Sequence, residues 1–295
     1  MCLRFSGTSA SAPLAAAIIA LALEANPKLS WRDLQHLLVQ TSHRSKLISA
    51  DWRMNAAGRY YSHRFGYGLI DAGRFVSRSK DWITVPSQHS CTTSVIETTD
   101  QYADIEPNKP LILYFESDSS CTQHVEKLEH VILKLSVDFD RRGDLKISIF
   151  SPSGTESNVL DQRPNDSSKD GFDEFEFLTV HFWDEANEDG QWTVKVEDVS
   201  NKGHVGTLRL VQLILYGTAW YQYPAECKYP NVYDMESDSC FMGCPRRKYA
   251  HEFTNAISNC YPCHEGCTTC TGSEKEDCNN WKSGSGKSTL TTSSY

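Results

Sequence analysis

The sequence lacks several features that define common classes of protein. We find no apolar run near the roughly 18 residues that a membrane span needs, and no apolar segment with a cleavage site that would mark a signal peptide at the N-terminus. A basic excess is also missing, since the net charge at pH 7 is −9. We therefore expect no membrane span in this chain and no nucleic acid among its partners, because acidic surfaces repel phosphates.

Complete nucleotide-binding motifs are also missing. Residues 65–73 contain Gly66-Tyr67-Gly68 but do not continue as the GxGxxG of a dinucleotide site. We expect these glycines to allow a tight turn before a short helix over 72–79. The Gly-Lys-Ser at 286–288 lacks the leading glycine of a phosphate loop and lies in a polar tail, 279–295, which we expect to be disordered.

The first part of the chain, residues 1–83, has the pattern of helices. Residues 9–25 are rich in Ala, Leu and Ile on all sides, which is typical of a helix buried within a larger domain. Ser30 and Asp33 have the spacing of a capping box, so a second helix is expected to begin there. The apolar residues of this second helix recur at helical spacing and predict one buried face, made of Trp31, Leu34, Leu37 and Leu38.

The middle part of the chain, residues 84–218, alternates short apolar segments with turns, which predicts an all-β sandwich. We expect strands over 111–115, 131–137, 145–150, 175–180, 192–197 and 207–216. Period-two alternation predicts inward-facing side chains at Leu145, Ile147, Ile149, Trp192, Val194 and Val196. Cys91 and Cys121 are the only cysteines in this part of the chain and are expected to form a disulfide.

Three short motifs each allow a functional and an ordinary interpretation. Residues 142–144 spell Arg-Gly-Asp, a tripeptide read by some adhesion receptors, but we interpret it as a hairpin turn between two strands. Residues 246–248, Arg-Arg-Lys, could be a cleavage site and are interpreted as an ordinary basic loop. Asn165-Asp166-Ser167 is an N-glycosylation sequon in a polar loop, plausible in a secreted protein.

Cysteines concentrate near the C-terminus, where eight of the eleven lie between Cys227 and Cys278. Such density predicts a small disulfide-rich module over residues 219–278 and an oxidising compartment. The alternative is zinc, since the spacings Cys260-x-x-Cys263 and Cys267-x-x-Cys270 suit chelation. Eight thiols are too many for one four-cysteine site, so disulfides are favoured. Cys2 has no obvious partner within the chain.

Ser9 is the candidate catalytic residue. It lies in Ser6-Gly7-Thr8-Ser9-Ala10-Ser11-Ala12-Pro13, at the start of the apolar helix, where free N–H groups and the positive end of the helix dipole can stabilise an oxyanion. Gly7 permits a sharp entry to the helix, and Pro13 is expected in its first turn, where a missing N–H costs little. On this physical chemistry alone, a serine that only caps the helix is the favoured alternative.

A resemblance to a known family favours the catalytic role of Ser9 over the capping role. The segment 7–13, GTSASAP, resembles the serine signature of subtilisin-family proteases, in which the serine directly after Gly-Thr is the nucleophile; that position is Ser9. The resemblance extends through residues 14–42 and through FGYGLIDAG at 65–73. RRGDLKISIFSPSGT at 141–155 and LILYGTA at 213–219 resemble the P domain of kexins, and the cysteine-rich stretch resembles furin-like repeats. The chain is therefore similar, over roughly residues 2–278, to the C-terminal part of furin/kexin-like proprotein convertases.

The resemblance implies the fold class and the domains. We expect the C-terminal portion of an α/β subtilisin-like catalytic domain over 1–83, the β-sandwich P domain over 84–218, and the furin-like cysteine-rich region over 219–278. In this family the P domain packs against the catalytic domain and stabilises it. Opposite net charges on the first two parts suit such docking.

The resemblance also implies an activity, which is cleavage of precursor proteins after paired basic residues, in the secretory pathway or outside the cell. Expected partners are these precursors, a propeptide and an N-terminal catalytic segment. The triad aspartate and histidine precede the serine in this family, so both are expected upstream of residue 1, as are the ligands of the calcium expected for the family. His36, His43 and His63 follow Ser9 and are not expected to replace the missing base.

Two expectations follow for the chain by itself. Without the triad partners, the 295 residues are expected to be inactive alone. The alternative function, from a different class, is a non-catalytic secreted binding module made of the sandwich and the cysteine-rich repeats.

Overall fold

The computed structural model of the chain describes residues 7–45, 47–49, 51–97, 104–117, 119–187, 190–200 and 202–218, together with short segments between 232 and 281. The chain divides into two compact units. One contains Met1–Ile48, Tyr67–Thr84 and Gln222–Tyr295, and the other contains Ser49–Gly66 and Val85–Tyr221.

Three helices form the first part of the chain: α1 (Thr8–Ala25), α2 (Trp31–Thr41) and α3 (Ala72–Lys80). The predicted capping box is confirmed, because the Ser30 hydroxyl accepts from the Asp33 N–H at 3.1 Å and the Ser30 N–H donates to the Asp33 carboxylate at 2.7 Å. Asp33 also accepts a hydrogen bond from the indole N–H of Trp82 at 2.9 Å. The start of α2 is therefore tied to the residues that follow α3.

The buried face of α2 matches the predicted one only in part. Trp31 has 62% of its surface exposed, although Leu37 is fully buried. The buried residues of this helix are mostly polar: Arg32, Asp33, His36, Leu37, Gln40 and Thr41. The prediction is confirmed for Leu37, which is in the hydrophobic cluster of this part, and for Leu34 and Leu38, which pack against it. It is wrong for Trp31, which opens the helix, and Asp33 is buried by its cap and by Trp82 instead.

Helix α1 is confirmed as a helix but is not enclosed by the described residues. Only Ala22 is buried, where it packs with Leu29, Leu37 and Phe75. The helix has 18 residues with a mean hydropathy of 1.5, and 6% of it is buried. By length and composition it could cross a membrane, which corrects our expectation that no apolar run reaches this length. A core helix and a signal sequence have the same properties.

The Gly66-Tyr67-Gly68 stretch forms the expected tight turn. Gly68 has φ of 125°, a conformation that side chains disfavour. A Cβ at this position would lie 2.5 Å from the carbonyl oxygen of His43, because His43 and Leu69 pair there as an isolated β-bridge. The predicted helix follows as α3, whose N-cap Asp71 accepts from the Arg74 N–H at 2.9 Å.

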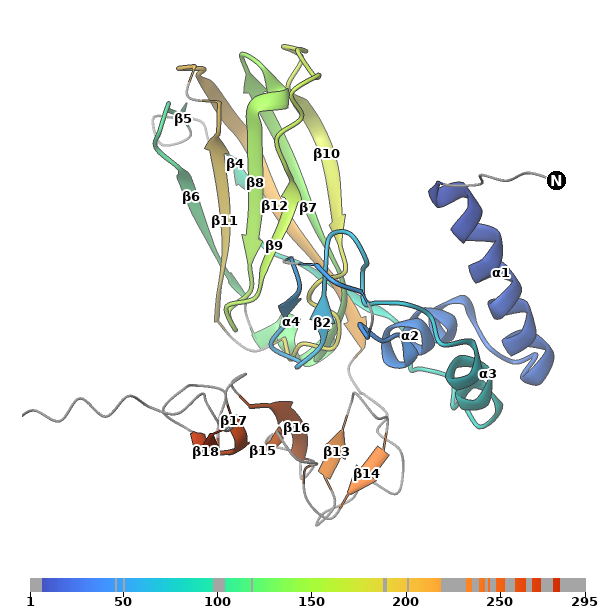
Figure 1. Ribbon diagram of the computed structural model, residues 1–295. Coiled ribbons are helices and arrows are strands. Elements are labelled where there is room, and N and C mark those ends of the chain that lie inside the picture. Colours follow the sequence, from blue (N-terminus) through green and yellow to red (C-terminus); the bar gives the residue numbers. More distant parts are fainter. Residues whose placement is uncertain are drawn as a thin grey trace, which may run out of the picture. The chain divides into compact units, whose positions relative to one another are not determined.

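The middle part of the chain is the expected sandwich of antiparallel strands (Figure 1). One sheet has the order β10 (Phe172–Thr179), β7 (Lys127–Phe139), β12 (Gly206–Thr218) and β3 (His89–Thr92), with β4 (Ile96–Glu97) and β5 (Asp104–Ile105) also paired to β12. The other has the order β6 (Leu111–Ser117), β11 (Gly190–Asp198), β8 (Leu145–Phe150) and β9 (Glu156–Leu160). The short helix α4 (Ser119–His124) follows β6.

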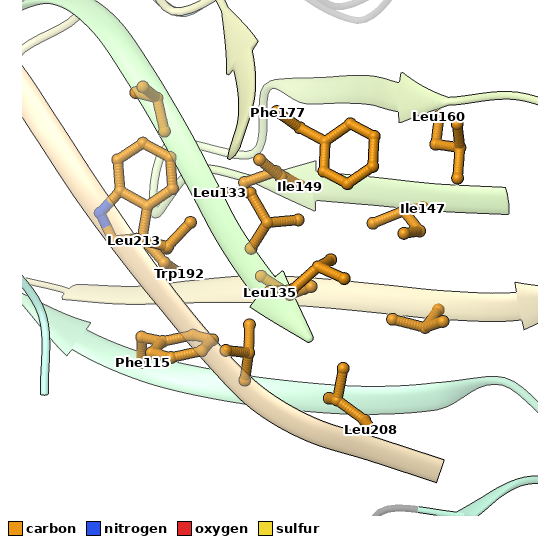
Figure 2. Close-up of a cluster of buried hydrophobic side chains, with 14 of the residues drawn as sticks. Phe115, Leu133, Leu135, Ile147, Ile149, Leu160, Phe177, Trp192, Leu208 and Leu213 are labelled. Atoms are coloured by element: carbon orange, nitrogen blue, oxygen red, sulfur yellow. The ribbon is translucent and has the colours of Figure 1, made fainter. Parts of the chain in front are cut away.

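The inner faces of the two sheets form one hydrophobic core, as Figure 2 shows. Val194 of β11 lies opposite Ile149 of β8 and Leu113 of β6. Full burial confirms the predicted inward-facing set, Leu145, Ile147, Ile149, Trp192, Val194 and Val196. All six predicted strands are present. The prediction missed β3, β4, β5 and β9, which are short or largely polar and lack a clear alternation.

The Arg-Gly-Asp tripeptide is not a hairpin turn. Arg142–Asp144 forms a single 3-10 turn between β7 and β8, which belong to different sheets, so the chain crosses from one sheet to the other here. A Cβ on Gly143 would lie 2.1 Å from the carbonyl oxygen of Asp166. The Asp144 side chain is 1% exposed, with its carboxylate 3.4 Å from the His204 imidazole. A receptor has no access to the aspartate of this tripeptide.

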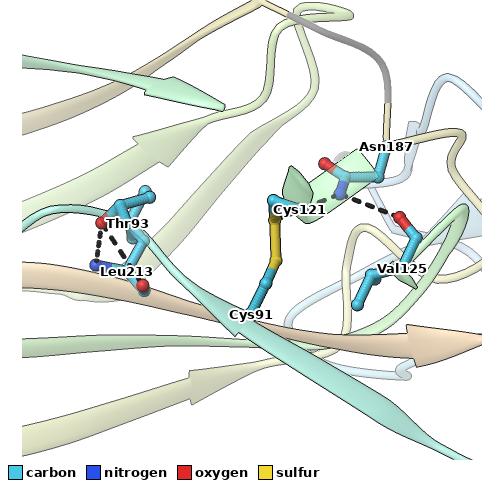
Figure 3. Close-up of a disulfide and its surroundings, with 6 residues drawn as sticks. All are labelled: Cys91, Thr93, Cys121, Val125, Asn187 and Leu213. Atoms are coloured by element: carbon cyan, nitrogen blue, oxygen red, sulfur yellow. Dashed lines mark hydrogen bonds between the residues drawn. A yellow bond between two sulfur atoms is a disulfide. The ribbon is translucent and has the colours of Figure 1, made fainter. Parts of the chain in front are cut away.

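The expected disulfide between Cys91 and Cys121 is confirmed and joins β3 to α4 (Figure 3). Beside it, the Asn187 side-chain amide donates to the Val125 carbonyl at 2.9 Å. Thr93, the residue after β3, makes two hydrogen bonds to β12, from its N–H to the Leu213 carbonyl and from the Leu213 N–H to its hydroxyl, both at 3.0 Å. The disulfide therefore fixes an edge of the sandwich.

The cysteine-rich part forms disulfides, as favoured. The described bonds are Cys244–Cys260, Cys263–Cys270 and Cys267–Cys278. They use all four sulfurs of the two chelating pairs, so the zinc alternative is wrong. The strands here are β13 (Val232–Asp234), β14 (Ser239–Phe241), β15 (Lys248–Glu252), β16 (Ser258–Pro262), β17 (Cys267–Cys270) and β18 (Cys278–Trp281). Residues 279–281 of the predicted tail thus lie in a strand. Cys2, Cys227, Arg246, Arg247 and 282–295 lie outside the described residues.

We predict that replacing Cys91 and Cys121 together by serine lowers the free energy of unfolding of the sandwich by roughly 3 to 4 kcal/mol, because the disulfide closes a loop of 30 residues. Urea denaturation followed by tryptophan fluorescence measures this change. The matched control replaces Cys263 and Cys270, which should leave the sandwich transition in place. An unchanged midpoint in the first variant would contradict the prediction.

Candidate active site

Ser9 is the second residue of α1. The N-cap is Gly7, with φ of 118° and ψ of 155°, and no side chain caps the helix. The positive φ confirms that glycine allows the sharp entry predicted from the sequence. Ser9 itself is exposed and lies inside the helix, so the alternative that it serves as the helix cap is wrong.

The backbone around Ser9 has unusual hydrogen-bonding capacity. The first N–H groups of a helix have no acceptor four residues earlier in the chain, and the helix dipole adds positive potential there. In α1 the Ala10 N–H already donates to the Gly7 carbonyl at 3.0 Å. Because α1 begins at Thr8, Pro13 lies in the second turn rather than in the first, as we had expected. Its missing N–H would have bonded to the carbonyl of Ser9. The positive end of the helix dipole, and not the carbonyl that Pro13 leaves unbonded, favours a negative charge beside the Ser9 hydroxyl.

The three histidines that follow Ser9 make contacts elsewhere. His36 is buried in α2. The Nδ1 atom of His43 lies 2.5 Å from the Ser45 hydroxyl. His63 packs edge-to-face on His181, with ring centroids 4.8 Å apart. That none of them acts as the general base stays a prediction.

A second group of residues, which the sequence analysis missed, holds a hairpin against the sandwich. Strands β1 (Arg53–Met54) and β2 (Tyr60–Tyr61) pair in antiparallel register, and we call residues 53–61 the docking hairpin. The Asn55 side-chain amide donates to the carbonyls of His181 and Trp183, both at 2.9 Å. Asn55 also accepts from the Arg59 N–H at 2.9 Å, which fixes the turn of the hairpin.

A buried ion pair lies at the centre of this contact. The Arg59 guanidinium contacts the Asp184 carboxylate, and each side chain is only 6% exposed. Charges at this depth need a partner, because desolvation of an unpaired charge costs several kcal/mol. Loss of either Arg59 or Asp184 would therefore leave the charge of the other residue buried and unpaired.

Further polar contacts surround the ion pair. The Ala56 N–H donates to the Thr155 hydroxyl at 2.9 Å and to the Glu185 carboxylate at 3.0 Å. The Tyr61 hydroxyl donates to the Glu156 carbonyl at 2.6 Å. Burial raises the pKa of Glu185 above its ordinary value and raises the pKa of Tyr61 to about 12. The docking hairpin is thus held mainly by hydrogen bonds and charge.

His181 lies between the docking hairpin and the sandwich. Its ring stacks on Tyr61 with centroids 4.4 Å apart, and its Nδ1 atom lies 2.9 Å from the Ser157 hydroxyl. Burial, together with the nearby positive charges of His63 and Arg53, lowers the pKa of His181 to about 4. The folded protein therefore keeps this imidazole neutral in a pH range where an exposed histidine is charged.

One sequence signal could have identified part of this site. Asp184 and Glu185 follow Phe182-Trp183 directly, and such a pair of acids beside two large aromatic residues is unusual in a strand-rich region. Their partner residues precede them by more than a hundred positions, so the pairing itself has no local signature.

Comparison with known proteins identifies the families that two parts of the chain resemble. Residues 1–68 match the family model described as the subtilase family, and residues 128–215 match the one described as the proprotein convertase P-domain. Furin from Mus musculus is 40% identical over 300 residues, which cover 92% of this chain and 37% of furin. Human proprotein convertase subtilisin/kexin type 4 is 38% identical over 92% of this chain and 40% of its own length. The chain thus spans about two fifths of these relatives.

A solved structure is similar in fold. The serine protease of Aeromonas sobria has a TM-score of 0.63 and 23% sequence identity, over 72% of this chain and 44% of its own. Together the comparisons confirm the predicted fold class, which is a piece of a subtilisin-like domain, then a β-sandwich P domain, then a disulfide-rich module.

We predict that Arg59→Met lowers the free energy of unfolding by about 3 to 5 kcal/mol, because it leaves the Asp184 charge buried and unpaired. The double variant Arg59→Met with Asp184→Leu should regain most of that loss. Arg209→Met is the control, since Arg209 pairs with Asp138 at an exposed site and should contribute less than about 1 kcal/mol. Chemical denaturation of the full chain measures all three. Equal losses in the single and double variants would contradict the prediction.

We predict that the stability of the sandwich falls as the pH is lowered from about 6.5 to about 4. In this window the unfolded chain binds a proton at His181 and the folded chain does not, so the unfolding free energy decreases by up to about 3 kcal/mol. Glu185 acts in the opposite direction, because its raised pKa lets the folded state hold a proton that the unfolded state releases above about pH 4.5. His181→Phe keeps a ring against Tyr61 and should flatten the pH dependence. Parallel curves for the two proteins would contradict the assignment to His181.

Proposed function

Because the chain belongs to the furin-like proprotein convertases of the subtilase family, we propose that the whole protein is a serine endopeptidase that cleaves precursor proteins after paired basic residues, with Ser9 as its nucleophile. The observation that carries this proposal is the placement of Ser9. It directly follows Gly7-Thr8 at the exposed N-terminus of α1, within the segment that matches the subtilase family.

In the proposed reaction the Ser9 hydroxyl attacks the scissile carbonyl. A histidine accepts the hydroxyl proton and later delivers it to the leaving amine, and an aspartate holds the histidine in orientation. We propose that both come from a segment preceding residue 1. The N–H groups in the first turn of α1, with the positive end of the helix dipole, stabilise the oxyanion of the tetrahedral intermediate.

The exposure of α1 supports a preceding catalytic segment. Leu14 is 69% exposed and Leu21 is 51% exposed, on a helix that is apolar on all sides. Burial of each such side chain contributes about 1.5 to 3 kcal/mol to stability, so another protein surface packed on α1 would be stabilising. We propose that residues 1–83 are the C-terminal portion of the catalytic domain and that the preceding segment covers α1.

We propose that residues 84–218 stabilise the catalytic domain, and the contacts of the docking hairpin support this role. The hairpin lies within the stretch that matches the subtilase family, and Arg59 and Asn55 bond it to Asp184 and Trp183 of the sandwich. The cysteine-rich region, 219–278, follows the sandwich, and because β18 ends at Trp281 we propose the tail only for residues 282–295.

The disulfides support a secretory or extracellular location, where we also place the precursor substrates and a propeptide. Calcium is expected for this family. In the part of the chain that the structure describes, no three His, Cys, Asp or Glu side chains gather to hold an ion. These residues do not fit a calcium site, and we propose that its ligands lie in the preceding segment.

Kinetics of the whole protein test the proposal. We predict that Ser9→Ala lowers kcat on a fluorogenic dibasic peptide by on the order of 10⁶-fold, because no other group can make the first attack. Ser11→Ala is the matched control, since Ser11 lies in the same turn region and should not be needed. The isolated 295-residue chain should release no product. The proposal fails if Ser9→Ala remains active, if Ser11→Ala loses as much, or if the isolated chain cleaves in a Ser9-dependent way.

A further inference from the structure

The connection between β9 and β10 contains the one Asn-x-Ser/Thr triplet of the sequence without proline in the middle, Asn165-Asp166-Ser167. This triplet is the acceptor for N-linked glycans in proteins that enter the secretory pathway. Its local structure decides whether the folded chain can accommodate a bulky modification there.

The triplet lies in a turn that is open to solvent. Pro164 and Asn165 are the central residues of this turn, closed by a hydrogen bond from the Asp166 N–H to the Arg163 carbonyl at 2.9 Å. Strand β9 ends at Leu160 and β10 begins at Phe172, so the triplet takes no part in the ladder of either sheet. Asn165 and Ser167 are both exposed, and a glycan on Asn165 displaces no packed side chain.

The middle residue of the triplet anchors the turn. The Asp166 carboxylate accepts from the Arg142 guanidinium at 2.9 Å and lies 3.0 Å from that of Arg163. It also accepts from the Ser168 N–H at 3.2 Å. The hydrogen bond from Arg142 lowers the pKa of Asp166, so its carboxylate stays ionised and bonded. Asp166 is therefore held against the protein, between two exposed neighbours.

The turn lies at the opposite end of the sandwich from the docking hairpin. The hairpin contacts Glu156 at the start of β9 and residues 181–185 just after the end of β10, whereas the triplet lies between the end of β9 and the start of β10. Strand β10 connects the two ends, as Figure 1 shows. At about 3.3 Å per residue, its eight residues span roughly 26 Å. A glycan at Asn165 leaves the hairpin contact free.

We propose that Asn165 carries an N-linked glycan, an inference that rests on the proposed passage of the protein through the secretory pathway. The donor is an oligosaccharide linked to a lipid pyrophosphate. The Asn165 side-chain nitrogen attacks the anomeric carbon, the bond from that carbon to the pyrophosphate oxygen breaks, and the lipid pyrophosphate leaves as the amide nitrogen loses one proton. The Ser167 hydroxyl is the part of the acceptor that the transferase recognises.

The test uses the full 295-residue chain behind a cleavable signal peptide, in cultured animal cells, with protein taken from the medium and from the protease-protected lumen. Peptide N-glycosidase in heavy-oxygen water converts a glycosylated asparagine to a labelled aspartate, which peptide mass spectrometry locates. We expect the label at position 165, its loss in Asn165→Gln and in Ser167→Ala, and its retention in Ser167→Thr.

A control separates failure of the site from failure of the proposed location. Pro110→Thr creates a second triplet that begins at Asn108, in another exposed turn. If this chain is labelled at Asn108 while position 165 stays unlabelled, the transferase has acted and the inference is overturned. The signal peptide supplies entry to the pathway, so neither result depends on where the whole protein is found in its own cells.

Discussion

A buried charge needs an opposite charge beside it, and the pair formed by Arg59 and Asp184 is the constraint on which the attachment of the docking hairpin to the sandwich depends. The hydrophobic core of the sandwich is complete without the docking hairpin, so apolar burial alone does not hold the hairpin there. Asn55, Ala56 and Tyr61 add hydrogen bonds around the ion pair. The docking hairpin matches the subtilase family in sequence but belongs to the unit that contains the P domain. The limit between the two family matches is therefore not a boundary between structural units.

The sequence predicts the local parts of this fold well. Alternation identified the buried strands β8 and β11, and the spacing of Ser30 and Asp33 identified the start of α2, because each signal lies within a few residues. The contact between Asn55 and Trp183 joins positions 128 residues apart, and no periodic pattern encodes it. The predicted burial of Trp31 was wrong for a different reason. Its helical spacing matched the buried face, but its position at the first turn left it exposed.

The candidate active site was predictable only in part. The glycine at position 7 and the serine at the start of an apolar helix could be read from the sequence, and the positive φ of Gly7 gives the physical reason for that glycine. The exposure of most of α1 could not be predicted, because an apolar pattern indicates a preference for burial and does not say which surface covers the helix. Pro13 lies one turn deeper than expected, since the helix begins at Thr8 rather than later.

The crossing turn between the two sheets has a consequence for the lifetime of such an enzyme. Arg141-Arg142 is itself a pair of basic residues, the kind of sequence that the proposed protease cleaves. A protease binds its substrate in an extended form, whereas this pair leads into a 3-10 turn whose next residues, Gly143 and Asp144, are buried. If the protein has the proposed activity, the native fold therefore protects the pair from cleavage by other copies of the enzyme. Once the sandwich unfolds, the same residues become a substrate, so loss of structure in one molecule would mark it for destruction by its neighbours.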